Sequence, residues 1–101
     1  MTEAVGAYEL EILTGSRGEE EGRRAELFLR SEQGDRLASI TFYDPGVTLG
    51  QEFVSRANLP MLQLHTDMLP SVLALLHSDK LVFVELTDRG GRMTTTEDST
   101  V

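Results

Sequence analysis

The sequence predicts an α+β fold, with a largely antiparallel sheet of about five or six strands and one principal helix packed on one face. Two observations support this prediction. Three segments in the first half of the chain alternate apolar and polar residues, a period typical of strands. In the second half, Leu69, Val72, Leu73 and Leu76 recur at helical spacing. The expected order is strand, strand, strand, helix, strand, helix, strand, strand.

The first three predicted strands form a meander. Residues 7–14 alternate with a period of two, and residues 23–30 and 36–43 repeat the pattern. The polar link over residues 31–35 favours a hairpin between the second and third strands. The Asp44-Pro45-Gly46 sequence then predicts a turn, because proline presets φ and glycine accepts a positive φ.

The second half of the chain mixes helices and strands. Apolar residues at every fourth position predict a short helix over 49–57, and residues 61–65 predict a brief strand. The principal helix is predicted over 67–77, with Thr66 or Asp67 as its cap. Residues 81–86 are apolar at five of six positions, which predicts a central strand covered on both faces. Residues 93–96 then predict an edge strand.

A chain of 101 residues can bury one small core, so we expect a single domain over residues 1–101. The chain has no cysteine, so its stability depends on packing without disulfides. Residues 15–22 contain three glycines and three adjacent glutamates and predict a mobile acidic loop. Residues 97–101 are expected to form a frayed tail.

Composition also predicts where the protein acts. No signal peptide and no apolar run long enough to cross a membrane is found, so we expect a cytoplasmic protein that is not bound to a membrane. The formal net charge is -8, which disfavours binding to nucleic acid and to anionic lipid.

We expect neither an enzyme nor a cofactor or metal site. The two histidines, His65 and His77, flank the predicted principal helix, and about 11 helical residues span about 16 Å, so the rings are too far apart to share a metal ion. No phosphate-binding glycine loop and no nucleophile elbow occurs. The run Glu19-Glu20-Glu21 lacks the alternating ligand spacing of a calcium loop.

Apolar residues occur on both faces of the predicted sheet. One helix covers one face, whereas the other face would leave too much apolar surface in water for a small monomer. We therefore expect either residues 49–57 or a second copy of the chain to cover it. The favoured function is a non-enzymatic interaction or adaptor module that forms a homodimer, or binds another protein, through a sheet face or edge. The candidate interface residues are Leu13, Phe28, Leu37, Tyr43, Leu81 and Phe83.

The alternative function is binding of single-stranded nucleic acid by the second hairpin. Residues 23–36 carry four arginines and three acidic residues, a net charge of +1, whereas the remainder carries 5 basic and 14 acidic residues, a net charge of -9. Arginine interleaved with an aromatic residue on a sheet is one way to stack unpaired bases. The candidate contacts are Arg23, Arg24, Phe28, Arg30 and Arg36. The acidic total makes this alternative the weaker one.

Overall fold

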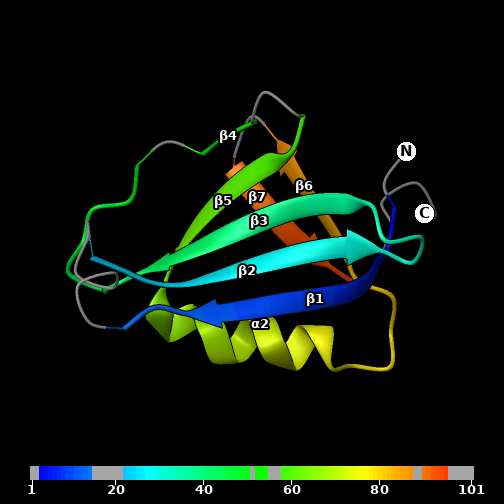
Figure 1. Ribbon diagram of the computed structural model, residues 1–101, viewed down its shortest axis with the longest axis horizontal. Helices are drawn as coiled ribbons and strands as arrows, with labels where there is room; N and C mark the ends of the chain where they lie inside the picture. The colour runs from blue at the N-terminus through cyan, green and yellow to red at the C-terminus, as the bar shows by residue number, and fades with distance from the viewer. Residues whose placement is uncertain (1–2, 15–21, 51, 55–57, 88–89, 96–101) are drawn as a thin grey trace.

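The computed structural model describes residues 3–14, 22–50, 52–54, 58–87 and 90–95 (Figure 1). The elements are, in chain order, β1 (Val5–Ile12), β2 (Arg23–Ser31), β3 (Arg36–Tyr43), β4 (Phe53–Val54), β5 (Pro60–His65), η2 (Thr66–Met68), α2 (Leu69–Leu76), β6 (Phe83–Thr87) and β7 (Gly90–Thr94). The predicted α+β class is confirmed. The predicted mobile loop, apart from Gly22, and the predicted frayed tail lie outside the described residues.

Two sheets make up the fold. The larger sheet has five strands in the order β1-β2-β3-β5-β4, and the smaller one is the hairpin β6-β7. All pairs are antiparallel except β3 with β5, which run in the same direction from Ser39↔Met61 to Tyr43↔His65. The largely antiparallel arrangement and the predicted β1-β2-β3 meander are therefore confirmed.

A short polar turn joins β2 to β3. Ser31 is 2% exposed, and its Oγ accepts hydrogen bonds from the backbone N–H groups of Gln33 and Asp35, each at 3.2 Å. The Ser31 N–H donates to the Asp35 carbonyl at 2.7 Å. Gly34 has φ of +89°, a conformation that a residue with a Cβ rarely adopts. These contacts set the register of the hairpin.

One face of the larger sheet, called the inner face here, carries the core. Phe42, Leu27, Leu29 and Ile40 are the largest fully buried side chains. The helix α2 and the hairpin β6-β7 both lie against this face (Figure 1). They add Val72 and Val84 to the core cluster. Burial of each such side chain stabilises the fold by about 1.5–3 kcal/mol relative to exposure.

The predicted principal helix is confirmed, with a different beginning. The α-helix spans Leu69–Leu76, has Pro70 in its first turn and buries Val72. The prediction that Thr66 or Asp67 caps it is wrong, because both belong to the 3-10 turn η2 that leads directly into α2. Met68 occupies the cap position and makes no side-chain capping bond.

The predicted helix over 49–57 is wrong. Residues 53 and 54 form the edge strand β4, in which Phe53 opposes Met61 and Val54 opposes Pro60. Residues 51 and 55–57 lie outside the described part of the chain. An isolated helix of nine residues is not stable in water, so pairing with the edge of β5 overrides the local pattern.

The prediction that residues 81–86 form a central strand is also wrong. The strand β6 begins at Phe83 and pairs with β7. Among the described residues, its backbone pairing outside the hairpin is an isolated bridge between Phe83 and Ala4. Val82, Phe83 and Val84 are nevertheless buried. These residues are apolar because the hairpin packs on the inner face of the larger sheet. That packing buries them, whereas the prediction assumed that they lay between two neighbouring strands of the sheet. The strand β7 begins at Gly90, earlier than the predicted 93–96.

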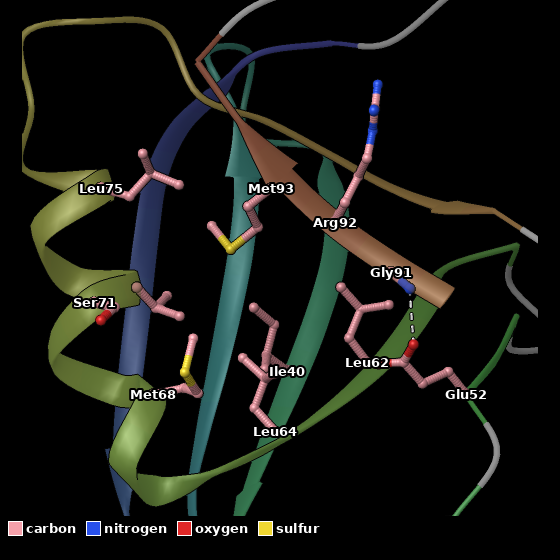
Figure 2. A pocket seen from close by; sticks show the side chains of 11 residues that line it. Ile40, Glu52, Leu62, Leu64, Met68, Ser71, Leu75, Gly91, Arg92 and Met93 are labelled. Atoms are coloured by element: carbon pink, nitrogen blue, oxygen red, sulfur yellow. Dashed lines mark hydrogen bonds between the residues drawn. The ribbon is translucent and has the colours of Figure 1, made fainter. Parts of the chain in front are cut away.

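Glu52 joins the two sheets. Its Oε2 accepts a hydrogen bond from the Gln63 N–H of β5, and its Oε1 accepts one from the Gly91 N–H of β7, both at 2.8 Å. Figure 2 shows the Glu52–Gly91 bond at the side of the hairpin. A Cβ on Gly91 would lie 2.4 Å from Leu62 Cδ2, so any larger residue there would force the buried Leu62 side chain or β7 to shift. The Glu52 carboxylate thus links the backbone of β5 to the backbone of β7.

We predict that Leu27→Ala lowers the free energy of unfolding by about 2–5 kcal/mol, because Leu27 is fully buried and its loss leaves a cavity. Ile12→Ala is the matched control, since Ile12 is 59% exposed and its truncation should change stability by at most about 0.5 kcal/mol. Urea denaturation followed by circular dichroism measures both values. Equal losses in the two variants would contradict the assignment of the inner face as the core.

Candidate functional site

The opposite side of the larger sheet, called the outer face here, carries the candidate site. No helix or strand among the described residues lies over it, since α2 and β6-β7 are both on the far side (Figure 1). Cross-strand partners share a face, and the register therefore identifies the residues. The outer face carries Glu9 and Glu11 on β1, Glu26 and Phe28 on β2, Ser39, Thr41 and Tyr43 on β3, and Met61, Gln63 and His65 on β5.

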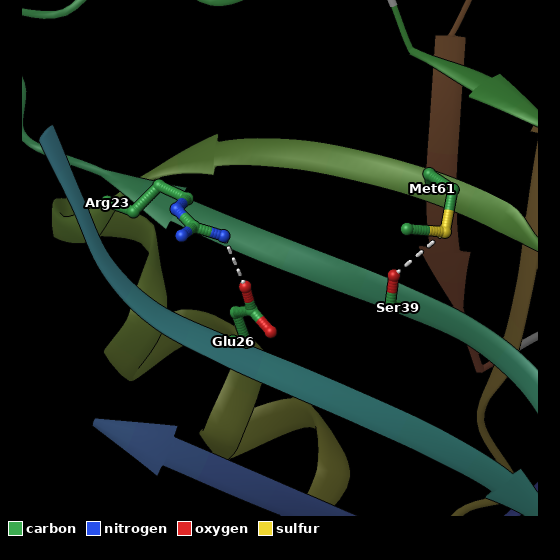
Figure 3. Close-up of polar contacts among 4 residues, drawn as sticks. All are labelled: Arg23, Glu26, Ser39 and Met61. Atoms are coloured by element: carbon green, nitrogen blue, oxygen red, sulfur yellow. Dashed lines mark hydrogen bonds and ion pairs between the residues drawn. The ribbon is translucent and has the colours of Figure 1, made fainter. Parts of the chain in front are cut away.

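Phe28 lies at the centre of the outer face. It is half-buried and stands between Glu9 of β1 and Ser39 of β3. Next to it, the Ser39 hydroxyl donates to the thioether of Met61 at 3.1 Å (Figure 3). The centre of the outer face is thus aromatic and thioether surface with one weakly bonded hydroxyl.

The β5 side of the outer face is shielded by the segment that follows β3. His65 Nε2 donates a hydrogen bond to the Val47 carbonyl at 2.7 Å. A Cβ at Gly50 would lie 3.5 Å from Gln63 Oε1, so the backbone there passes close to the Gln63 side chain. That oxygen is buried and has no hydrogen-bond partner within the described part of the chain.

The four candidate arginines lie in two pairs at opposite ends of the β2-β3 hairpin. Arg23 Nη1 bonds Glu26 at 2.9 Å (Figure 3), and Arg24 Nε bonds Asp44 at the same distance. At the other end, Arg30 opposes Arg36 and donates to the Gly34 carbonyl at 3.4 Å. Seven residues along a strand separate the pairs by about 20 Å.

Acidic groups surround the one aromatic residue that the nucleic-acid alternative requires. Glu9 is the direct cross-strand neighbour of Phe28, and Glu11 opposes Glu26 on the same face. A phosphate backbone that passed over Phe28 would meet these carboxylates before it reached either arginine pair. The geometry therefore does not bring the five predicted contacts into one basic surface.

The six predicted interface residues also separate into groups. Leu13 and Phe83 are buried within the chain, Leu37 packs against the core cluster, and Leu81 is 56% exposed just before β6. Only Phe28 and Tyr43 share the outer face. Met61 was missed, although the alternation of residues 61–65 places it on the same side as Gln63 and His65.

The two histidines stand at opposite ends of the helical segment, as their spacing predicts. His65 precedes η2, and His77 follows α2 as its C-cap residue. The His77 Nε2 and the Tyr8 hydroxyl are hydrogen-bonded, and the two rings pack with centroids 5.7 Å apart. This contact ties the end of α2 to β1.

Within the described ranges, no three His, Cys, Asp or Glu side chains come together as a metal site. Nor does that part of the chain contain a helix long and apolar enough to cross a membrane. No family model, curated protein or solved structure matches the chain. The functional interpretation therefore depends on the two faces of the sheet.

The Arg24–Asp44 ion pair fixes the start of β2 to the turn after β3. Both side chains are partly exposed, at 40% and 42%. The hydrogen bond from Arg24 holds the pKa of the Asp44 carboxyl below its usual value, and the guanidinium charge acts in the same direction, whereas desolvation opposes both.

We predict that Arg24→Gln raises the pKa of Asp44, as measured by NMR titration of the carboxyl carbon. A folded-state pKa below the unfolded value means that the pair stabilises the fold above the unfolded pKa. This contribution is lost as the pH falls through the folded pKa. Arg30→Gln is the control, because Arg30 lies at the other end of β2. An Asp44 titration unchanged by Arg24→Gln would rule out the arginine as the cause.

Proposed function

We propose that this protein is a non-enzymatic interaction module that self-associates through the outer face of its sheet. One observation carries the proposal. The inner face is covered by α2 and β6-β7, whereas Phe28, Tyr43 and Met61 stand on a face over which the described chain places no helix or strand. Apolar surface of this kind on a small protein is typical of an interface.

A second copy of the chain suits this face because both signs of charge occur on it. Glu9 and Glu11 form an acidic stripe along β1. Arg30 is the cross-strand partner of Ala7, which shares a side of β1 with Glu9, so this arginine lies at one end of the same face. A two-fold interface brings the same patch together twice, so a patch with acids and bases at different places can be self-complementary. The net charge of -8 would oppose any less specific association.

We predict a particle of about twice the 11.2 kDa chain mass in light scattering at micromolar concentration, because a two-fold dimer is the commonest symmetric assembly. X-ray scattering should give a radius of gyration larger than the 13.6 Å of one chain. Phe28→Glu should yield monomers, since it places a charge at the centre of the face. Ile12→Glu should leave the dimer intact, because Ile12 is exposed on the inner-face side of β1. A wild-type monomer at this concentration would refute the proposal.

We also predict no saturable binding of single-stranded DNA or RNA at about 50 mM salt, where electrostatic attraction is strongest. The acidic neighbours of Phe28 and the divided arginine pairs are the reason. Binding is measured by the fluorescence anisotropy of labelled oligonucleotides titrated with the protein. Micromolar binding that disappears in the double variant Arg24→Glu, Arg30→Glu would instead establish the nucleic-acid function.

A further inference from the structure

A cleft of about 240 Å³ opens on the inner side of the fold, between α2, the larger sheet and β7 (Figure 2). Its floor is formed by Ile40, Leu62 and Val72, which are at most 6% exposed. Met68 and Ser71 lie at its open rim, and Met68 is 44% exposed. The cleft therefore reaches from the solvent to the core cluster.

Two thioethers line this cleft from opposite sides. Met68 enters from the beginning of the helical segment and Met93 from β7, and Figure 2 shows both side chains directed into the space between helix and sheet. Leu64 and Leu75 complete the walls. Methionine sulfur makes favourable contacts with aromatic rings and adapts to their shape. These walls favour a flat aromatic ligand over a branched aliphatic ligand.

The charged groups at the cleft are occupied within the protein. Both oxygens of Glu52 accept backbone hydrogen bonds, from Gln63 and Gly91. Arg92 Nε bonds Glu85 at 2.5 Å. Figure 2 shows the Arg92 side chain directed away from the other lining side chains, so an anionic ligand in the cleft would meet the Glu52 carboxylate instead. A ligand charge without a partner is costly in an apolar site. The Ser71 hydroxyl at the rim can bond one polar atom of a ligand.

We propose that this cleft binds an uncharged aromatic molecule of one or two rings. An apolar cavity of about 150 Å³ accommodates benzene, so the larger volume found here suits a fused two-ring compound such as indole. The site is separate from the outer face, and its occupation does not depend on self-association.

The methionines provide a direct test with indole as the probe. In protein labelled at the methionine methyl groups, indole should shift the Met68 and Met93 signals by ring-current effects, with saturation and a dissociation constant of about 1 mM or tighter. Met61 is the internal reference, because it lies on the outer face and contacts Ser39. Its signal should stay in place.

Two variants distinguish the cleft from other surfaces. Ser71→Trp should weaken indole binding at least tenfold, because a large ring at the rim closes the cleft. Ala74→Trp is the matched control, since Ala74 is exposed on the same helix and does not line the cleft. Indole-3-carboxylate should bind at least tenfold more weakly than indole, because its charge would approach Glu52.

The possible outcomes decide the proposal. Saturable shifts confined to Met68 and Met93, lost in Ser71→Trp and kept in Ala74→Trp, would support it. Equal shifts of Met61, or no shifts at millimolar indole, would overturn it. Tighter binding of the carboxylate would overturn the uncharged ligand class. Met68 and Met93 signals that move on dilution without indole would assign the cleft to a second copy of the chain.

Discussion

The parallel pairing of β3 with β5 determines where every later element lies. Because the two strands run in the same direction, the chain after Tyr43 must run back along the length of β3 before β5 can begin. This connecting segment runs beside the edge of β5 that faces away from β3, and it places β4 and Glu52 at that edge. β5 then ends at the same edge as β3, so η2 and α2 start at that edge and run back beneath the inner face (Figure 1). The hairpin β6-β7 occupies the rest of that face.

This path concentrates the cover on one side of the sheet. The helix and the hairpin lie side by side on the inner face without filling it, and the cleft is the space between them. Of the described residues, the backbone of 47–50 lies against the outer face near His65 and Gln63. An unequal distribution of cover therefore produces both candidate sites, a deep one lined by aliphatic and thioether groups and a flat one centred on Phe28.

Local patterns predicted the parts of the fold that depend on local contacts. The meander follows from residue alternation and a short polar turn at Ser31, and α2 follows from its apolar spacing. The errors at 49–57 and 81–86 arose where pairing with distant residues decided the structure: β4 is held by β5, and Val82 to Val84 are buried by the inner face. Phe28 and Tyr43 could be assigned to one face by parity. The cleft could not be predicted, because β5, α2 and β7 form it only after the parallel pairing has placed them.

The bridge between Ala4 and Phe83, with the adjacent hydrogen bond from the Val5 N–H to the Val82 carbonyl, joins the first strand to the last hairpin. Contacts so distant along the chain close a large loop, whereas the meander closes only short ones. We therefore expect the meander to order early in folding and the hairpin to dock late. The hairpin that this bridge holds in place also carries β7, whose residues 91–93 line the cleft, so docking of the hairpin and formation of the cleft are one event.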